Sequence, residues 1–141
     1  LAILLLGFGW AGRKDTEVVL MDDLLFVNGT LMRGLGLHSN LNGAELVKDT
    51  KTAPEYRLHD IGGVHPGMYK VESDGVAVEG ELYTLPLDVL LKVVEGEPAG
   101  LYRGAVELED GSVVPGVLYE EALAKKHPEI KDGSWRNHTS K

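Results

Sequence analysis

Four consecutive residues, Asn28, Gly29, Thr30 and Leu31, directly follow a short apolar stretch at residues 24–27. A strand that ends in a glycine-containing loop exposes successive backbone N–H groups. Such groups can hold a carboxylate or the oxygen of a polarised carbonyl. The four residues therefore form one candidate ligand-binding loop, and an ordinary turn is the alternative that the residues alone leave open.

Glu95 is the second candidate, because it follows Val94 directly at the expected C-terminal end of a helix. The negative end of the helix dipole disfavours a carboxylate there, and partial burial adds to that effect. Both raise the pKa of the carboxyl group and suit it to general acid–base catalysis near neutral pH. An exposed glutamate in the last helical turn is the alternative, and Glu97 is a rival carboxylate nearby.

The remaining polar residues show no established motif. The five histidines lack metal-ligand spacing, so we expect no metal site among them. His65 could line a pocket or lie in a surface loop, and His38 could cap a helix or contact a ligand. Tyr102 is most simply a core or rim aromatic residue. Phosphate-binding loops, dinucleotide fingerprints and nucleophile elbows are absent from the sequence.

Short apolar segments separated by turn residues must position these groups, and they favour many short strands. We expect a loop over 61–67, a hairpin over 101–119 that turns at 109–111, and strands at 24–27, 44–48, 53–58, 68–72 and 76–85. The last strand alternates with period two, which places Glu79, Glu81 and Tyr83 on one face.

A helix is predicted to begin at Pro86 and to end before Gly96 and Pro98. Its apolar face consists of Leu87, Leu90, Leu91 and Val94. A second, short helix is expected over 120–126, followed by a polar tail. The prediction is a single α+β domain with a mostly antiparallel, barrel-like sheet and one or two packed helices.

The composition of the chain limits the kinds of partner that it could bind. The chain has 141 residues and a formal net charge of −8, which argues against nucleic acid or an anionic membrane as a main partner. There are no cysteines, so disulfides and thiolate chemistry are excluded and a cytoplasmic location is expected.

The first 23 residues have an uncertain status. Their apolar run is too short to span a bilayer and lacks the preceding basic residues of a secretion signal. Met21 could be the natural start, or residues 3–6 could add a strand to the domain. We expect an N-terminal extension at 1–23 and one domain at 24–141.

Three ordered motifs resemble the γ-glutamylcyclotransferase-like superfamily, also called AIG2-like or BtrG-like. Members carry Tyr-Gly-Ser/Thr-Leu after the first strand; here Gly29, Thr30 and Leu31 match, and Asn28 stands in the place of the tyrosine. "GELY" at 80–83 matches a later strand, and "EGEPAGLY" at 95–102 resembles the element with the catalytic glutamate.

This resemblance implies a function. The glutamate would be Glu95, and Tyr102 would close the spacer after it and contribute to substrate binding. The loop would cradle a γ-glutamyl group while Glu95 moves a proton, so that the substrate's α-amino group attacks the γ-carbonyl and 5-oxoproline forms. Such transferase or lyase chemistry on a small amide needs no cofactor.

A second resemblance runs through the middle of the chain. "TAPEYRL" at 52–58, "HPGMYKV" at 65–71 and "VELEDGSVVPGVLYE" at 106–120 are similar to the C-terminal domain of allophanate hydrolase. That likeness implies two alternatives: processing of a urea or carbamoyl-type metabolite, or a non-catalytic accessory domain with an amidase partner.

Overall fold

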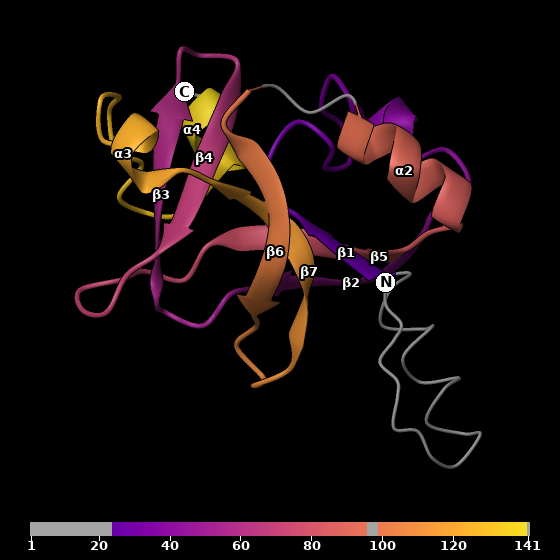
Figure 1. Ribbon diagram of the computed structural model, residues 1–141, viewed down its shortest axis with the longest axis horizontal. Helices are drawn as coiled ribbons and strands as arrows, with labels where there is room; N and C mark the ends of the chain where they lie inside the picture. Colours follow the sequence, from indigo (N-terminus) through magenta and orange to yellow (C-terminus); the bar gives the residue numbers. More distant parts are fainter. Residues whose placement is uncertain (1–23, 96–98, 141) are drawn as a thin grey trace.

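The computed structural model describes residues 24–95 and 99–140, with the backbone alone at 94 and 95. The elements in chain order are β1 (Leu24–Val27), the 3₁₀ helix η2 (His38–Leu41), β2 (Glu45–Lys51), β3 (Tyr56–Ile61), β4 (His65–Lys70), β5 (Glu79–Thr84), α2 (Leu87–Glu95), β6 (Leu101–Glu107), β7 (Val113–Tyr119), α3 (Glu121–Ala124) and α4 (Trp135–Thr139) (Figure 1).

Five strands form one sheet in the order β2-β5-β1-β7-β6. All pairs are antiparallel except β1 with β7, which are parallel and paired at Phe26 and Gly116. The sheet is open, and a single bridge between Thr52 and Leu108 joins the ends of its two edge strands. The predicted α+β class with a mostly antiparallel sheet is confirmed.

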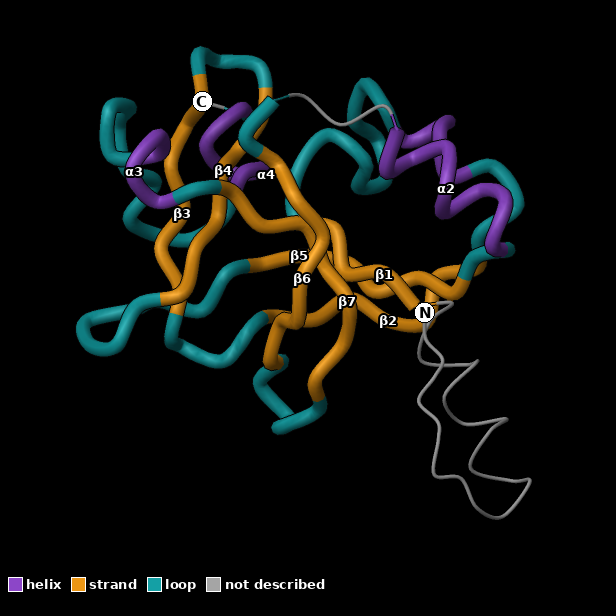
Figure 2. Tube along the Cα trace, viewed as in Figure 1, coloured by secondary structure: helices purple, strands orange, loops and turns teal. Residues whose placement is uncertain are grey.

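A separate hairpin, β3–β4, stands beside this sheet, and helices α3 and α4 lie next to it, with α2 on the other side of the molecule (Figure 2). The turn of the hairpin uses Gly62 and Gly63 at positive φ. The prediction of a loop over 61–67 is wrong in its second half, because β4 begins at His65. Pro66 is tolerated there because β4 is an edge strand, where a missing N–H leaves no ladder bond unmade.

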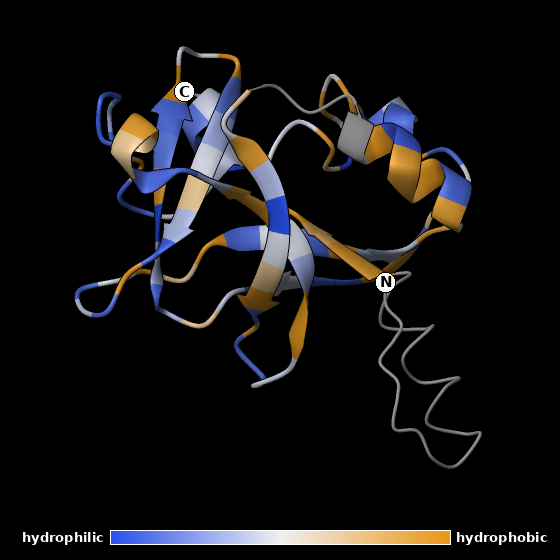
Figure 3. Ribbon diagram, viewed as in Figure 1, coloured by the Kyte–Doolittle hydropathy of each residue, from blue (hydrophilic) through white to orange (hydrophobic). Residues whose placement is uncertain are grey.

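Helix α2 contributes to the main core, and of its predicted apolar face the side chain of Val94 lies outside the described part of the chain. Leu90 and Val93 are buried, whereas Leu87 and Leu91 are more than half exposed. The predicted apolar face is therefore wrong at those two leucines. Figure 3 shows how apolar and hydrophilic residues alternate along this helix.

The C-terminal tail is more ordered than its polar composition suggests. Trp135 is buried in the main core, and Ser134 caps α4 by accepting a hydrogen bond from the N–H of Asn137. The hairpin over 101–119 is confirmed, with β6 and β7 paired along their length. No helix within the described residues has the length and apolar character that crossing a membrane requires.

Candidate functional site

The loop after β1 uses its carbonyl groups and leaves its N–H groups free. Three internal donors take the carbonyl oxygens: Met32 N–H bonds to Gly29 O, Leu37 N–H to Thr30 O, and His38 Nδ1 to Leu31 O, each at 2.9 Å. Within the described residues, the N–H groups of 29, 30 and 31 have no hydrogen-bond partner. We call these three residues the amide loop.

Gly29 lets the amide loop approach the β3–β4 hairpin. A Cβ on this glycine would lie 2.6 Å from Cδ of Pro66, so a larger residue would force β4 away. The neighbouring Asn28 is 7% exposed, and its Nδ2 donates to the sulfur of Met68 at 3.3 Å. The loop and the start of β4 therefore meet closely, and both belong to the wall of one cavity.

This cavity has a volume of about 260 Å³, which is small for a ligand site. Its wall comes from β1 and the amide loop, from η2 and its approach, from the β3–β4 turn, and from α2, β6 and β7. The residues are Val27, Asn28, Gly29, Thr30, Leu31, Leu37, Asn40, Val64, His65, Pro66, Val93, Leu101 and Val117. None of these described residues carries a carboxylate, an ammonium or a guanidinium group.

His65 is a cavity residue. Its Nδ1 lies 2.8 Å from the carbonyl oxygen of Pro66, and its ring meets Tyr119 edge-on at 5.7 Å. A carbonyl only accepts, so Nδ1 carries the proton, and neutral His65 keeps a lone pair on Nε2. The sequence could not separate this place from a surface loop, because only pairing with β3 turns residues 65–67 into a strand.

Glu95 ends helix α2, two residues after Val93, which lines the cavity. The side chain of Glu95 lies outside the described part of the chain, as does all of Glu97. The orientation of the proposed acid–base carboxylate toward the amide loop therefore stays a prediction.

Tyr102 is 49% exposed on β6, and its neighbour Leu101 is the residue that lines the cavity. Successive side chains of a strand point to opposite faces, so the two residues face different sides of β6. Tyr102 is not among the described residues that line the cavity. Substrate binding by Tyr102 therefore stays a prediction.

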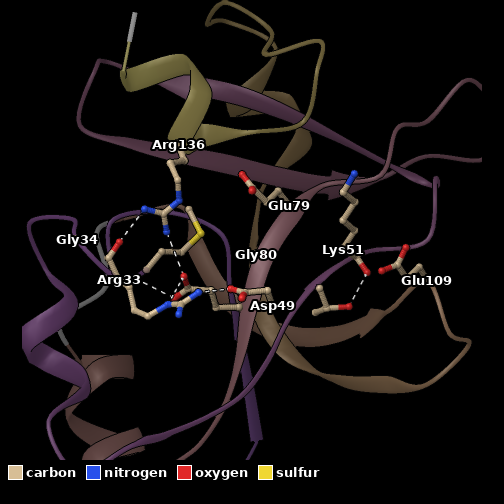
Figure 4. Close-up of a pocket in the computed structure, with 11 residues that line it drawn as sticks. Arg33, Gly34, Asp49, Lys51, Glu79, Gly80, Glu109 and Arg136 are labelled. Carbon is tan, nitrogen blue, oxygen red and sulfur yellow. Dashed lines mark hydrogen bonds and ion pairs between the residues drawn. The ribbon is translucent and has the colours of Figure 1, made fainter.

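A second cavity, of about 590 Å³, begins where the amide loop ends. Its wall is strongly charged and comes from the end of the loop, β2, β5, the β6–β7 turn and α4 (Figure 4). The buried carboxylate of Glu81 lies at its base, where both oxygens accept hydrogen bonds from arginine and tyrosine groups. Because those lone pairs are occupied, Glu81 is poorly suited to exchange protons with a ligand.

The chain is similar to proteins of one family and to a related short protein. A family model described as the allophanate hydrolase C-terminal domain matches residues 23–140. A Vibrio cholerae serotype O1 protein named "Putative gamma-glutamylcyclotransferase" is 32% identical over 117 residues, which cover 82% of this chain and 96% of that protein.

Two solved structures extend the comparison. A uropathogenic E. coli-specific protein is 45% identical, with a TM-score of 0.80 over 84% of this chain and 95% of that one. Kluyveromyces lactis allophanate hydrolase is 28% identical, with a TM-score of 0.75 over 83% of this chain. The present chain covers 21% of that enzyme, so it matches one part of a longer protein.

Both resemblances seen in the sequence thus have counterparts among these relatives. The family model spans the whole described structure, and the short relatives match over nearly their full length. The chain belongs to the allophanate hydrolase C-terminal domain family, within the γ-glutamylcyclotransferase-like superfamily.

Proposed function

We propose that this protein is an enzyme that cleaves a small γ-glutamyl-type or related amide in the cavity behind the amide loop, with Glu95 as the general acid and base. The observation that carries the proposal is the set of three free N–H groups at 29, 30 and 31, whose carbonyl groups are all used elsewhere. The name of the Vibrio cholerae relative supports the same reaction class.

The amide loop would act on the carbonyl oxygen of the scissile amide. As a nucleophile attacks, that oxygen gains negative charge, and N–H donors fixed in place stabilise it better than water does. Gly29 is buried, and the loop is braced by Met32, Leu37 and His38, so the donors need little reorganisation.

Glu95 would move the proton. The α-amino nitrogen of the substrate attacks its own γ-carbonyl carbon and gives its proton to the Glu95 carboxylate. The bond from the carbonyl carbon to the departing nitrogen then breaks, and Glu95 returns the proton to that nitrogen. The products are 5-oxoproline and a free amine, and no water is consumed. Because the attack is intramolecular, holding a reactive geometry supplies much of the rate.

The test is turnover of a panel of γ-glutamyl amino acids, followed as 5-oxoproline release. Glu95→Gln should abolish release and leave the melting temperature nearly unchanged, because the amide keeps the size of the side chain. Glu97→Gln is the matched control and should retain activity. A large loss of stability in Glu95→Gln would instead mark a structural glutamate, and full activity would refute its catalytic role.

A second candidate substrate is a urea or carbamoyl-type metabolite. The family model favours it, and so does the cavity wall, whose described residues offer neutral polar groups and no cation for a substrate carboxylate. Carbon dioxide or ammonia should then be released from substrates of this class. A silent assay across urea and carbamoyl compounds would count against this candidate.

A non-catalytic role beside an amidase is the remaining alternative, and it has its own outcome. The match to part of a longer hydrolase is the observation that favours an amidase partner. In that case the partner should copurify with both the natural protein and Glu95→Gln. Failure to recover any partner would weaken the non-catalytic alternative.

A further inference from the structure

Glu81 is a buried carboxylate outside the cavity that the proposed function uses. It lies on β5 opposite Val27, the last residue of β1, and only 2% of it is exposed. The chain therefore places a charge beside the point where the amide loop leaves the sheet. A buried charge is costly unless hydrogen bonds satisfy it, so the partners of Glu81 show what it holds.

Four donors surround this carboxylate. Oε1 accepts from the backbone N–H of Arg33 at 2.9 Å and from the hydroxyl of Tyr83 at 2.8 Å. Oε2 accepts from Arg33 Nε at 3.0 Å and from a terminal nitrogen of Arg136 at 3.1 Å. Side chains alone could neutralise the charge, but the bond to the Arg33 main chain ties it to the loop.

Arg136 holds the other peptide group of Arg33, on its carbonyl side. Its second terminal nitrogen donates to the carbonyl oxygen of Arg33 at 2.8 Å. Figure 4 shows Arg136 reaching down from α4 to the backbone of Arg33 and to the carboxylate beneath it. Both peptide groups of Arg33 are thus fixed, one by β5 and the other by the C-terminal helix.

The fixed residue directly follows the turn that shapes the amide loop. Met32 N–H donates to Gly29 O, and Arg33 is the next residue in the chain. A shift of Arg33 would be passed through this one-residue link to the free N–H groups. Glu81 and Arg136 do not line the 260 Å³ cavity, so any effect on its chemistry must act through the loop.

We propose that Glu81 and Arg136 are positioning residues, which clamp the backbone of Arg33 and thereby aim the N–H groups of the amide loop into the cavity. The proposal rests on the proposed function for its kinetic consequence only. The C-terminal helix is then part of the site, although it touches no ligand.

The test compares Glu81→Gln and Arg136→Gln with the control Asp49→Asn. Asp49 also pairs with the Arg33 side chain but is exposed and has no bond to its backbone. Hydrogen exchange at the N–H groups of Met32 and Leu37 reports on the loop, since these groups donate to its carbonyls. Exchange there should rise at least about tenfold in both test variants, with the β3–β4 amides unchanged.

Kinetics gives the second readout, on whichever γ-glutamyl or carbamoyl compound the natural protein turns over. In both test variants kcat should fall about 10- to 100-fold, with KM changed far less, because misplaced donors lose charge stabilisation in the transition state. Asp49→Asn should match the natural protein in both readouts.

Failure of the clamp and failure of the proposed function give different results. The clamp is overturned if, in both test variants, the N–H groups of Met32 and Leu37 exchange no faster than they do in Asp49→Asn. An unchanged kcat in both variants would also overturn it. Uniform acceleration at all amides would also overturn it, because it reports a global loss of stability. If the natural protein turns over none of the compounds, the proposed function fails, and the exchange pattern still decides the clamp. Arg136→Gln carries the test alone should Glu81→Gln not fold.

Discussion

The imidazole Nδ1 of His38 lies 2.9 Å from the carbonyl oxygen of Leu31, and this bond closes the far end of the amide loop. The carbonyl can only accept, so Nδ1 is the donor. The bond therefore ties the last carbonyl of the amide loop to the first residue of η2.

Replacing His38 with alanine should release that carbonyl group. We expect a loss of about 1 kcal/mol in the free energy of unfolding, the usual worth of one partly buried hydrogen bond. Urea denaturation measures it. His127→Ala is a control, since its side chain makes no hydrogen bond within the described part of the chain while its backbone carbonyl holds His59. Equal losses in the two variants would contradict a specific brace.

Gly29→Ala should disturb the cavity wall. The new Cβ would lie 2.6 Å and 2.8 Å from two ring carbons of Pro66, so the loop or β4 must shift, at a cost of about 1–3 kcal/mol. Turnover should fall as well, because the N–H groups that the proposed function uses would shift with the loop. Gly36→Ala is the matched control, since its Cβ meets nothing within 4 Å. Thermal melting and 5-oxoproline release would separate the two variants.

His65→Gln should lower turnover with little change in melting temperature. Neutral histidine keeps an acceptor at Nε2, and the half-buried ring lines the cavity beside the amide loop. Glutamine has similar length but lacks the imidazole Nε2 acceptor and the ring that meets Tyr119 edge-on. The measurement is 5-oxoproline release at a single pH. Unchanged turnover would show that His65 contributes packing alone.

Stability should depend on Glu81 in acid. Burial raises the pKa of Glu81, but the Arg33 N–H, the Tyr83 hydroxyl and the Arg33 charge outweigh burial and hold the pKa below its ordinary value of 4.5. A depressed folded pKa gives stability that is present above about pH 4.5 and is lost as pH falls through the folded pKa. Urea denaturation between pH 7 and pH 3 should show a smaller loss in Glu81→Gln than in the natural protein. If the free energy of unfolding fell equally with pH in both proteins, Glu81 would be excluded as a source of the stability lost in acid.

Thr52→Val should reveal how the sheet ends are held together. Its buried hydroxyl accepts from the N–H of Val78 at 2.9 Å and donates to the carbonyl of Ala53 at 2.8 Å. Removing the hydroxyl should leave the buried N–H of Val78 unpaired, at a cost of about 1–3 kcal/mol, whereas the Ala53 carbonyl still accepts from the N–H of Glu55 at 2.7 Å. Thr50→Val is the control, because the Thr50 hydroxyl makes only a 3.4 Å contact. Equal melting temperatures for the two variants would contradict this account.

Local patterns predict much of this fold. The 24–27 strand and the 101–119 hairpin follow from apolar runs and from the turn at Asp110 and Gly111. The amide loop follows from glycine after a strand. These features depend on neighbours in the chain, which sequence reasoning can see.

Other features depend on partners far along the chain. Period-two alternation puts Glu81 on a strand face but does not show that Arg33 and Arg136 meet it there and make its burial tolerable. Likewise, helical periodicity assigns Leu87 and Leu91 to a buried face, although in the structure Leu90 and Val93 are buried and those two leucines are more than half exposed. Ser134 and Trp135 are the signal for α4, a capping residue before a large apolar one, within a polar tail.

The parallel pairing of Phe26 with Gly116 has a consequence for synthesis of the chain. Among the strands that the structure describes, β1 is made first and its neighbour β7 is made last, so the centre of the sheet stays incomplete until the 101–119 hairpin has left the ribosome. Contacts of such long sequence separation slow folding and leave apolar edges open to wrong partners. Slow translation before residue 119 would therefore prolong the period in which β1 is vulnerable to aggregation.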